Sequence, residues 1–311
     1  MKNLQIYLII IAVMLSWGLN VTALKTLVQH FPTITIQAVR VFTAGIIVFL
    51  ILAWMKKLRK PTRTEYKYII LGALLNVTIH HLFLGVGLAN TSAVNGGLIL
   101  GMGPILTALM AILLLGTRLT LVKSIGFISG GVGITLTVLA GSEKGINGIS
   151  MGDFYVFISI LAQAISFIVI SKAARTMDPR LLTGYMFIFG SGLLFLIGLW
   201  SEPSGLASLA NGSVFLWLVF LGSAVIATAI GHMLYNYTVG IIGPAETSIF
   251  LNLNTFFSLL GAVILLNETI TGSHFLGLVF IVIGVLFGSG ALEDIMIKRK
   301  AKRTASYYHA P

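Results

Sequence analysis

Residues 91–133 read TSAVNGGLILGMGPILTALMAILLLGTRLTLVKSIGFISGGVG, and a shift of 151 positions leads to residues 242–284, IGPAETSIFLNLNTFFSLLGAVILLNETITGSHFLGLVFIVIG. Both stretches hold two apolar runs joined by a short polar hairpin. Their apolar, small and turn residues match without a gap. A repeat of this length indicates two homologous halves rather than a solenoid unit. In a membrane chain, paired halves are the architecture of many transporters.

The composition excludes a water-soluble globular domain. Of the 311 residues, 57% are hydrophobic and 9% are charged, and the mean hydropathy is +1.00. Soluble domains carry about 25% charged residues, so the bilayer has to be the solvent for this chain. The absence of cysteine excludes disulfides and thiolate metal sites. The net charge of +11 would fit a nucleic-acid partner, but the position of the charges argues against one.

A membrane-spanning helix needs about 20 apolar residues. The sequence predicts an all-α membrane protein of ten transmembrane helices with short connections, at residues 4–24, 34–55, 67–88, 92–115, 121–140, 152–171, 181–200, 214–237, 244–266 and 273–292. The first run is longer than a signal-peptide core and is interpreted as a retained span. A glycine-rich polar turn separates two five-helix repeats, and a charged tail follows them; we expect these units at residues 4–140, 152–292 and 293–311.

Lys and Arg residues are distributed unevenly between the two sides of this predicted bundle. With a cytoplasmic N-terminus, nearly all of them fall in cytoplasmic loops or in the tail, and only Lys25 and Lys144 lie outside. This distribution predicts cytoplasmic N- and C-termini, and contact with anionic lipid explains the net charge without nucleic acid. Arg40 lies in the second span and is interpreted as a topology signal that extends outward, with substrate binding as the alternative.

Five spans per half is an odd number, so the second half should enter the membrane inverted relative to the first. Inverted-topology repeats allow one fold to open alternately to either side around a central site. The sequence therefore predicts two inverted five-helix repeats.

Short motifs follow one another in order along the chain, and some of them have counterparts in both halves. They are Trp17-Gly18-Leu19-Asn20, Lys25, Arg40, Thr91-Ser92-Ala93, Pro104, Leu114-Leu115-Gly116, Leu119-Thr120, Gly126, Gly243-Pro244-Ala245, Leu265-Leu266-Asn267-Glu268-Thr269-Ile270-Thr271 and Gly277. With these motifs the chain resembles the EamA-type transporters of the drug/metabolite transporter superfamily over nearly its whole length. The resemblance implies ten helices, with helices 1, 3, 4, 6, 8 and 9 around a central cavity. It also implies export of metabolites, amino acids or drugs, which in many members depends on ion gradients.

Two positions depart from the family pattern. Thr117 stands where the family has a Glu after the fourth span, and the second half keeps that acid as Glu268. Thr255 stands where the family has a Pro in the ninth span, and the first half keeps it as Pro104. We therefore expect a kink in the first half only.

Polar side chains within spans are candidates for function because they are costly at membrane depth. The predicted cavity residues are polar or aromatic and come from spans that the family resemblance places at the centre: Trp17, Asn20, His80, His81, Asn95, His232, Tyr235 and Asn252. The 151 shift aligns His81 with His232 and Asn95 with Glu246. As alternatives, Trp17 serves packing and the histidines form structural hydrogen bonds between helices.

Glu246 is the acid placed most clearly within a span, near its cytoplasmic start. A partly desolvated carboxylate can exchange a proton, and histidine titrates near neutral pH. The hypothesis is that Glu246, with His81 or His232, couples proton movement to substrate movement. The alternative is an acid in a first helical turn, favoured by the helix dipole and in contact with interfacial water.

Glycines indicate one flexible span and one close helix contact. Gly101, Gly103 and Pro104 loosen the fourth span and are candidate hinges. The fifth and tenth spans carry glycines along one side, which predicts close approach of these two helices. The sequence leaves open whether that contact forms within one chain or between subunits.

No enzymatic motif is present: the chain lacks a phosphate-binding glycine loop, an HExxH pair and a nucleophile with an evident base. We expect no catalytic residue, no metal and no cofactor.

The predicted function is a secondary transporter that exports a small metabolite, amino acid or drug-like solute across the plasma membrane by alternating access. A channel-like facilitator and a non-transporting membrane partner protein are the alternatives. Its expected partners are a small-molecule substrate and the lipid bilayer, and it acts alone or as a homodimer. Cavity residues that are mostly neutral or aromatic, with one acid, favour amphipathic or cationic solutes.

Overall fold

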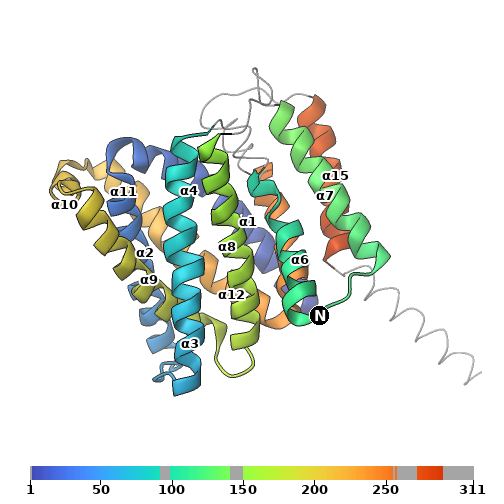
Figure 1. The fold of residues 1–311 in the computed structure, drawn as a ribbon, viewed down its shortest axis with the longest axis horizontal. Helices are drawn as coiled ribbons and strands as arrows, with labels where there is room; N and C mark the ends of the chain where they lie inside the picture. The colour runs from blue at the N-terminus through green and yellow to red at the C-terminus, as the bar shows by residue number, and fades with distance from the viewer. Residues whose placement is uncertain (1, 92–98, 141–149, 255, 258–271, 290–311) are drawn as a thin grey trace, which may run out of the picture.

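The computed structural model describes residues 2–91, 99–140, 150–254, 256–257 and 272–289, and the regular elements in these ranges are all helical (Figure 1). Within these ranges, five helices are long and apolar enough to cross a membrane: Thr33–Trp54, Arg63–Gly87, Met151–Ala173, Pro179–Ser201 and Val214–Ile242. Shorter apolar helices are Leu4–Asn20, Ile99–Leu115, Leu121–Leu136 and Phe275–Gly288. Large apolar side chains cover the outside, among them Trp54 and Trp200. Such a surface requires lipid.

The helices follow the predicted runs closely. The first half contains α1 (Lys2–His30), α2 (Thr33–Trp54), α3 (Arg63–Gly72), the π-helical η1 (Ala73–Ile79), α4 (His80–Ala89), α6 (Gly103–Leu115) and α7 (Leu121–Ala140). The second half contains α8 (Met151–Ala173), α9 (Pro179–Ser201), α10 (Gly205–Ser208), η2 (Leu209–Asn211), α11 (Val214–Gly222), the π-helical η3 (Ser223–Gly231), α12 (His232–Ile242), α13 (Pro244–Ser248) and α15 (Gly272–Gly288). The predicted tail and parts of the fourth and ninth runs lie outside the described residues.

Local side-chain bonds set several helix ends. At the start of α8, Ser150 Oγ accepts from Asp153 N (3.2 Å) and the Asp153 carboxylate accepts from Ser150 N (2.6 Å), which is a capping box. Thr62 and Glu65 form the same arrangement at the start of α3. Gly116 ends α6 with φ 66°, a left-handed conformation that glycine adopts without steric cost.

Each half contains a π-helical segment at the same place. The 151 shift carries residues 73–79 onto residues 224–230, which lie within η3. In each segment a threonine hydroxyl donates to the carbonyl five residues earlier: Thr78 to Ala73 O (3.2 Å) and Thr228 to Ser223 O (2.9 Å). π-Helical turns are rare and frequently mark functional sites. The internal repeat therefore extends to an irregular backbone feature.

The two halves pack on each other through equivalent helices. α2 lies along α9, and each of the two packs on the π-helical segment of the other half, α2 on η3 and α9 on η1. The core between them consists of apolar side chains from several helices. The second helix of each half thus faces the middle of the third span of the opposite half.

α7 and α15 form a separate pair at one side of the molecule (Figure 1). Their glycines bring the two backbones together: a Cβ on Gly133 would lie 2.7 Å from Gly277 O, and one on Gly284 would lie 2.7 Å from Gly130 Cα. The predicted contact between the fifth and tenth spans is confirmed. It forms within one chain, because both helices belong to the same molecule.

The helices in the predicted fourth and ninth runs are both interrupted. In the first half the helix turns at Met102, and in the second half residues 249–250 form a turn after α13. The prediction of a kink in the first half only is therefore wrong. No proline is needed in the second half, because the Ser248 hydroxyl donates to Ala245 O (2.9 Å) and competes with the helical hydrogen bonds.

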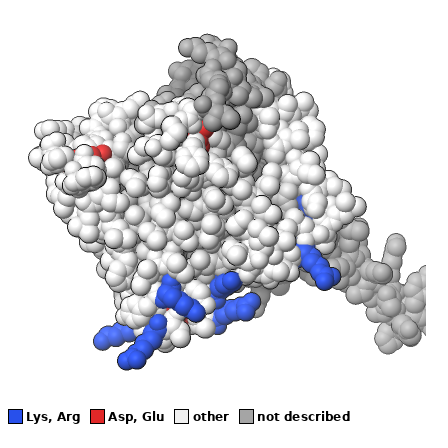
Figure 2. All heavy atoms as spheres, in the orientation of Figure 1, with Lys and Arg blue, Asp and Glu red and all other residues white. Residues whose placement is uncertain are grey.

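Charged side chains form hydrogen bonds between separate segments of the chain at both ends of the bundle. On the face shown in Figure 2, Lys and Arg gather along one edge, at the end where α3 begins. There Arg59 donates to both oxygens of Glu65 (2.7 and 2.6 Å) and to Thr176 O in the loop after α8 (3.0 Å). At the other end of α9, Glu202 accepts from Thr35 N (2.8 Å) at the start of α2.

Candidate functional site

The structure brings five of the predicted cavity residues into one group of rings. Trp17 of α1 lies 4.5 Å from His232 and 5.1 Å from Tyr235, measured between ring centroids. The rings of His81 and His232 are 6.5 Å apart, and those of His80 and His81 are 5.0 Å apart. We call these five residues the ring cluster. It joins both halves, because α1 and α4 belong to the first and α12 to the second.

The π-helical segment η3 positions Trp17. The indole Nε1 donates to Ala227 O at 2.8 Å, a carbonyl within that segment. Gly231 allows the indole to come this close, since a Cβ there would lie 2.6 Å from Nε1. The irregular backbone and the glycine together fix the tryptophan over α12.

His80 has the structural role that the sequence left as an alternative. Gln163 Nε2 lies 3.0 Å from His80 Nε2, and Ser159 Oγ lies 2.8 Å from Nδ1 and donates to His80 O (2.9 Å). These bonds are satisfied together when Gln163 donates to Nε2 and Nδ1–H donates to Ser159. One turn earlier, Asn76 donates to Ser166 Oγ (2.8 Å). His80 and Asn76 thus fasten η1 and α4 to α8.

Other polar atoms in and beside the ring cluster have no hydrogen-bond partner among the described residues. These buried atoms are both ring nitrogens of His81, Nδ1 of His232, the hydroxyl of Tyr235 and Oδ1 of Asn20, one turn along α1 from Trp17. Buried polar groups are normally hydrogen-bonded, and leaving one unpaired costs about 1–3 kcal/mol. Such atoms beside aromatic rings suit hydrogen bonds to a solute or to water.

Arg40 is a candidate that the sequence interpretation placed wrongly. Its side chain is 3% exposed, so it does not extend outward. The guanidinium donates to Gln37 Oε1 (2.6 Å) and Thr228 Oγ1 (2.5 Å), and Nη1 lies 3.5 Å from Ser223 Oγ. These bonds hold it against η3. The available signal was its depth within an apolar run, where a charged residue indicates function by default.

Glu246, the proposed proton-coupling residue, forms an ion pair. Its Oε1 lies 2.6 Å from Nζ of Lys123, and the pair joins the first turn of α13 to α7. About a quarter of the Glu246 side chain is exposed. In this conformation the acid is held by a cation on α7, whereas the ring cluster is built from α1, α4 and α12.

The remaining predicted residues lie near the interrupted spans. Asn252 is 1% exposed and packs against Gly130 of α7. Asn95 lies outside the described residues. Gly101 contacts the side chain of Ile134, and a Cβ on Gly103 would lie 3.1 Å from Ile160. Together with Pro104 in the first turn of α6, these glycines flank the turn at Met102, which is where a hinge was predicted.

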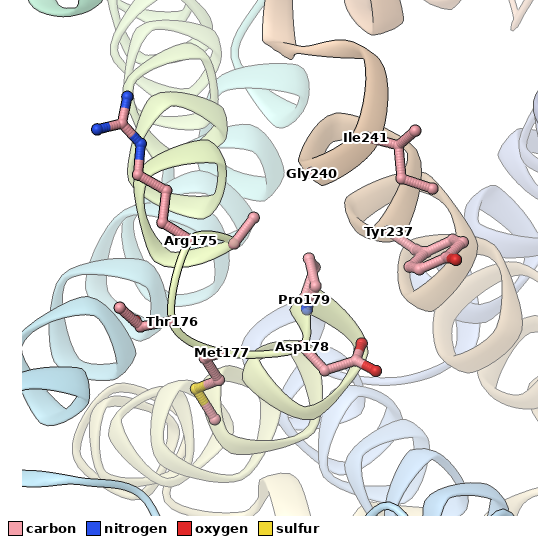
Figure 3. A pocket seen from close by; sticks show the side chains of 9 residues that line it. Arg175, Thr176, Met177, Asp178, Pro179, Tyr237, Gly240 and Ile241 are labelled. Carbon is pink, nitrogen blue, oxygen red and sulfur yellow. The ribbon is translucent and has the colours of Figure 1, made fainter.

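A surface hollow lies between the α8–α9 loop and α12, lined in part by Asp178 and Tyr237 (Figure 3). Arg180 lies over the Tyr237 ring at 4.4 Å and donates to Asp178 at 2.9 and 2.6 Å. Burial acts to raise the pKa of Asp178, but the hydrogen bonds from Arg180 and the charges of Arg180 and Lys57 lower it below its ordinary value. The bonds between Arg180 and Asp178 hold the loop in place, and no residue that lines the hollow belongs to the ring cluster.

Within the described ranges, no group of three or more His, Cys, Asp or Glu side chains is placed to bind a metal ion.

A family model described as the EamA-like transporter family matches the chain twice, at residues 4–139 and 150–289. The chain belongs to this family. EamA-like transporters are part of the drug/metabolite transporter superfamily, as the sequence motifs indicated. The protein is therefore a multi-pass membrane transporter, and its family points away from an enzyme.

Of three relatives of this EamA-like protein, two are named as uncharacterized transporters, and the third is named as a WAT1-related protein. The uncharacterized transporter YyaM of Bacillus subtilis is 27% identical over 297 residues, which cover 94% of this chain and 96% of YyaM. The uncharacterized transporter sll0355 of Synechocystis is 27% identical over 309 residues, covering 91% of this chain and 89% of the relative. The WAT1-related protein At3g02690, chloroplastic, of Arabidopsis thaliana is 23% identical, covering 84% of this chain and 64% of that protein.

A crystal structure of another protein has the same fold. It superposes with a TM-score of 0.79 at 16% sequence identity, covering 94% of this chain and 98% of the other. At this identity the likeness concerns the fold alone.

Proposed function

We propose that this EamA-like protein is a secondary transporter that moves a small metabolite, amino acid or drug-like solute by alternating access. The observation that carries the proposal is the pair of π-helical segments, η1 and η3, found at the same shift in the two halves. Each is followed by histidine and packs on the second helix of the other half. Two such halves, each of five spans and inverted relative to each other, would provide alternating access around their shared centre.

The ring cluster without His80, which is bonded to α8, is the proposed binding centre. Trp17 and Tyr235 offer flat apolar surfaces, and His81 and His232 offer nitrogen atoms without partners in the described structure. The turns at Met102 and at residues 249–250 interrupt the fourth and ninth spans. They are proposed as the points where these helices bend as access changes sides.

The proposed location is the plasma membrane, with export as the direction and both termini in the cytoplasm. Support comes from the basic loop before α3 and its contact with the loop after α8. Both loops lie at the end where Lys and Arg gather in Figure 2. Basic residues concentrate on the cytoplasmic side of membrane proteins.

Proton coupling through Glu246 is the finer part of the proposal. The ion pair with Lys123 would have to open during the cycle before the carboxylate could take a proton. A Glu246→Gln variant would then retain solute exchange and lose solute-dependent proton flux. If a solute-dependent pH change persisted in this variant, the coupling role of Glu246 would be removed.

Counterflow in liposomes tests the transport function. The purified protein is reconstituted with a pH dye inside, loaded with unlabelled solute, and offered labelled amino acids, organic acids and cationic drugs one at a time. Saturable accumulation driven by the internal solute supports a transporter. A linear, non-saturable flux would instead indicate a channel-like facilitator, and no flux a non-transporting membrane partner.

Matched tryptophan variants assign the function to the ring cluster. Trp17→Ala should abolish counterflow, because it removes the ring that packs against His232 and Tyr235. Trp200→Ala is the control, since that side chain is 87% exposed on the outside of the bundle. Equal losses in both variants would contradict the assignment.

A further inference from the structure

Arg40 is a buried cation without a carboxylate partner in the described part of the chain. The five Asp and Glu residues of those ranges are engaged elsewhere: Glu65 with Arg59, Asp153 with Ser150 and Thr91, Asp178 with Arg180, Glu202 with the start of α2, and Glu246 with Lys123. Burying a charge is costly unless an opposite charge compensates it. The buried charge of the guanidinium would therefore be compensated by an anion that this part of the chain does not supply.

The side chains around Arg40 orient its charge without neutralising it. Gln37, Ser223 and Thr228 are neutral and accept from the two terminal nitrogens. A guanidinium has five N–H donors in a rigid fork, so three bonds leave two donors, one of them on Nε, which is buried without a partner. A fork held in this way is pre-organised for a carboxylate or phosphate oxygen.

Arg40 adjoins the ring cluster through the same turn of η3. Thr228 accepts from the guanidinium, and the preceding carbonyl, of Ala227, accepts from the indole of Trp17. His232 follows one turn later and lies 4.5 Å from that indole. A solute bound by its anionic group at Arg40 would have aromatic rings beside its body.

We propose that Arg40 binds the anionic group of the transported solute, and that this solute is a small organic carboxylate or phosphate with a flat or apolar body. The body packs on Trp17 and Tyr235, and the unpaired nitrogen atoms of His81 and His232 accept or donate hydrogen bonds to its polar edges. This inference rests on the proposed transport function. It reverses the preference for cationic solutes, which counted Glu246 as the charged residue of the cavity.

Four probes with the same ring and different head groups test the charge preference: benzoate, phenyl phosphate, benzamide and benzylamine. The measured quantity is the rise in the thermal unfolding midpoint of the detergent-purified full chain as each probe is titrated, which reports binding to the folded state. We expect stabilisation by benzoate, by phenyl phosphate or by both, and none by the neutral amide or the amine. The stronger of the two anions identifies the head group.

An Arg40→Gln variant assigns this effect to the guanidinium. Loss of a hydrogen bond to a charged group should weaken binding of the anion by roughly 10-fold to 100-fold. Arg63→Gln is the control, because it removes the same charge from an exposed position at the start of α3. If Arg40→Gln does not fold, Thr228→Val is the second variant, since it removes one acceptor that fixes the guanidinium. This variant should reduce the stabilisation by the anion and leave the response to benzamide unchanged.

The inference is overturned if benzamide or benzylamine stabilises the protein as strongly as the anions do, if no probe stabilises it, or if Arg40→Gln binds benzoate like the unmodified chain. Counterflow separates this failure from failure of the proposed function. Saturable exchange of neutral or cationic solutes, without anion binding, would keep the transporter and remove the anion site. Arg40-dependent anion binding without exchange of any solute would support the site and contradict transport.

Discussion

The segments η1 and η3 have the same backbone conformation but differ in the charge that lies against them. In η1, Thr78 donates to a backbone carbonyl of α9, Gly190 O (3.2 Å), and the following His80 is fully bonded to α8. In η3, Thr228 accepts from the buried cation Arg40, and the following His232 keeps a buried nitrogen without a partner in the described residues. Buried atoms without a partner in the described residues occur beside both segments, at His81 after η1 and at His232 after η3. What distinguishes the segments is that η1 is held to its neighbours by neutral bonds, whereas η3 also holds a buried charge.

The buried charge at η3 indicates that this segment serves solute binding, whereas the neutral bonds at η1 serve helix packing. Sites that violate the ordinary rules of burial and hydrogen bonding tend to be functional, and the surrounding structure compensates for their cost. The bonds around η1 supply that compensation, since they fix α4, α8 and α9 against each other. We therefore expect substitutions near η1 to reduce stability without a specific effect on solute binding, and substitutions near η3 to reduce solute binding as well as stability.

The largest loss of stability should follow Gly190→Ala. A Cβ at this position of α9 would lie 2.8 Å from Ala73 O in η1 and would also meet Val77. Overpacking of this kind costs up to about 3 kcal/mol. The thermal unfolding midpoint in detergent measures it. Gly192→Ala, which places its Cβ in open space, should change the midpoint little, and equal shifts would contradict tight packing at η1.

The two π-segment threonines give the next effect. Thr228→Val deprives the guanidinium of Arg40 of an acceptor, and losing a hydrogen bond to a charge costs about 2 kcal/mol. Thr78→Val removes a neutral bond to Gly190 O and costs about 1 kcal/mol. The same unfolding measurement applied to both variants compares the segments directly. A larger loss for Thr78→Val would reverse the assignment of the charged role to η3.

Ser159→Ala should lower the free energy of unfolding by about 1 kcal/mol, because His80 loses its Nδ1 partner. Counterflow should remain, since His80 fastens helices and does not contact the solute in this account. Ser201→Ala, which removes a bond within an exposed helix end, is the matched control. If transport falls in Ser159→Ala while its unfolding midpoint equals that of the control, His80 belongs to the binding centre.

The smallest effect is expected at the loop that joins α8 to α9, the two helices that fasten η1. The folded-state pKa of Asp178 lies below its ordinary value of 3.8, so its contribution to stability is present above pH 3.8 and is lost as the pH falls through the folded pKa. The pairs are partly exposed, which limits the contribution to under about 1 kcal/mol. The unfolding midpoints of the unmodified chain and Asp178→Asn should therefore differ at pH 7 and converge as the pH falls below 3.8 and through the lowered folded-state pKa. A difference that stays constant with pH would contradict the ion pairs.

The sequence predicted those features that depend on local pattern. Apolar runs gave the helices, and the glycine faces gave the contact between α7 and α15. A π-helical turn has no comparable signature, because it changes backbone bonds without requiring a residue type. The turn at residues 249–250 was missed because no proline marks it. Arg40 and the Lys123–Glu246 pair were misjudged or missed because their partners are far along the chain.

Two-sided labelling of a single cysteine tests alternating access most directly. The natural chain contains no cysteine, so Asn20→Cys introduces one thiol beside Trp17, and Ser201→Cys introduces one at the exposed end of α9. A membrane-impermeant maleimide is applied to right-side-out and to inside-out vesicles. We expect the Asn20→Cys thiol to react from both sides and the Ser201→Cys thiol to react from one side only. Reaction of the Asn20→Cys thiol from a single side, with and without solute, would contradict alternating access around the ring cluster.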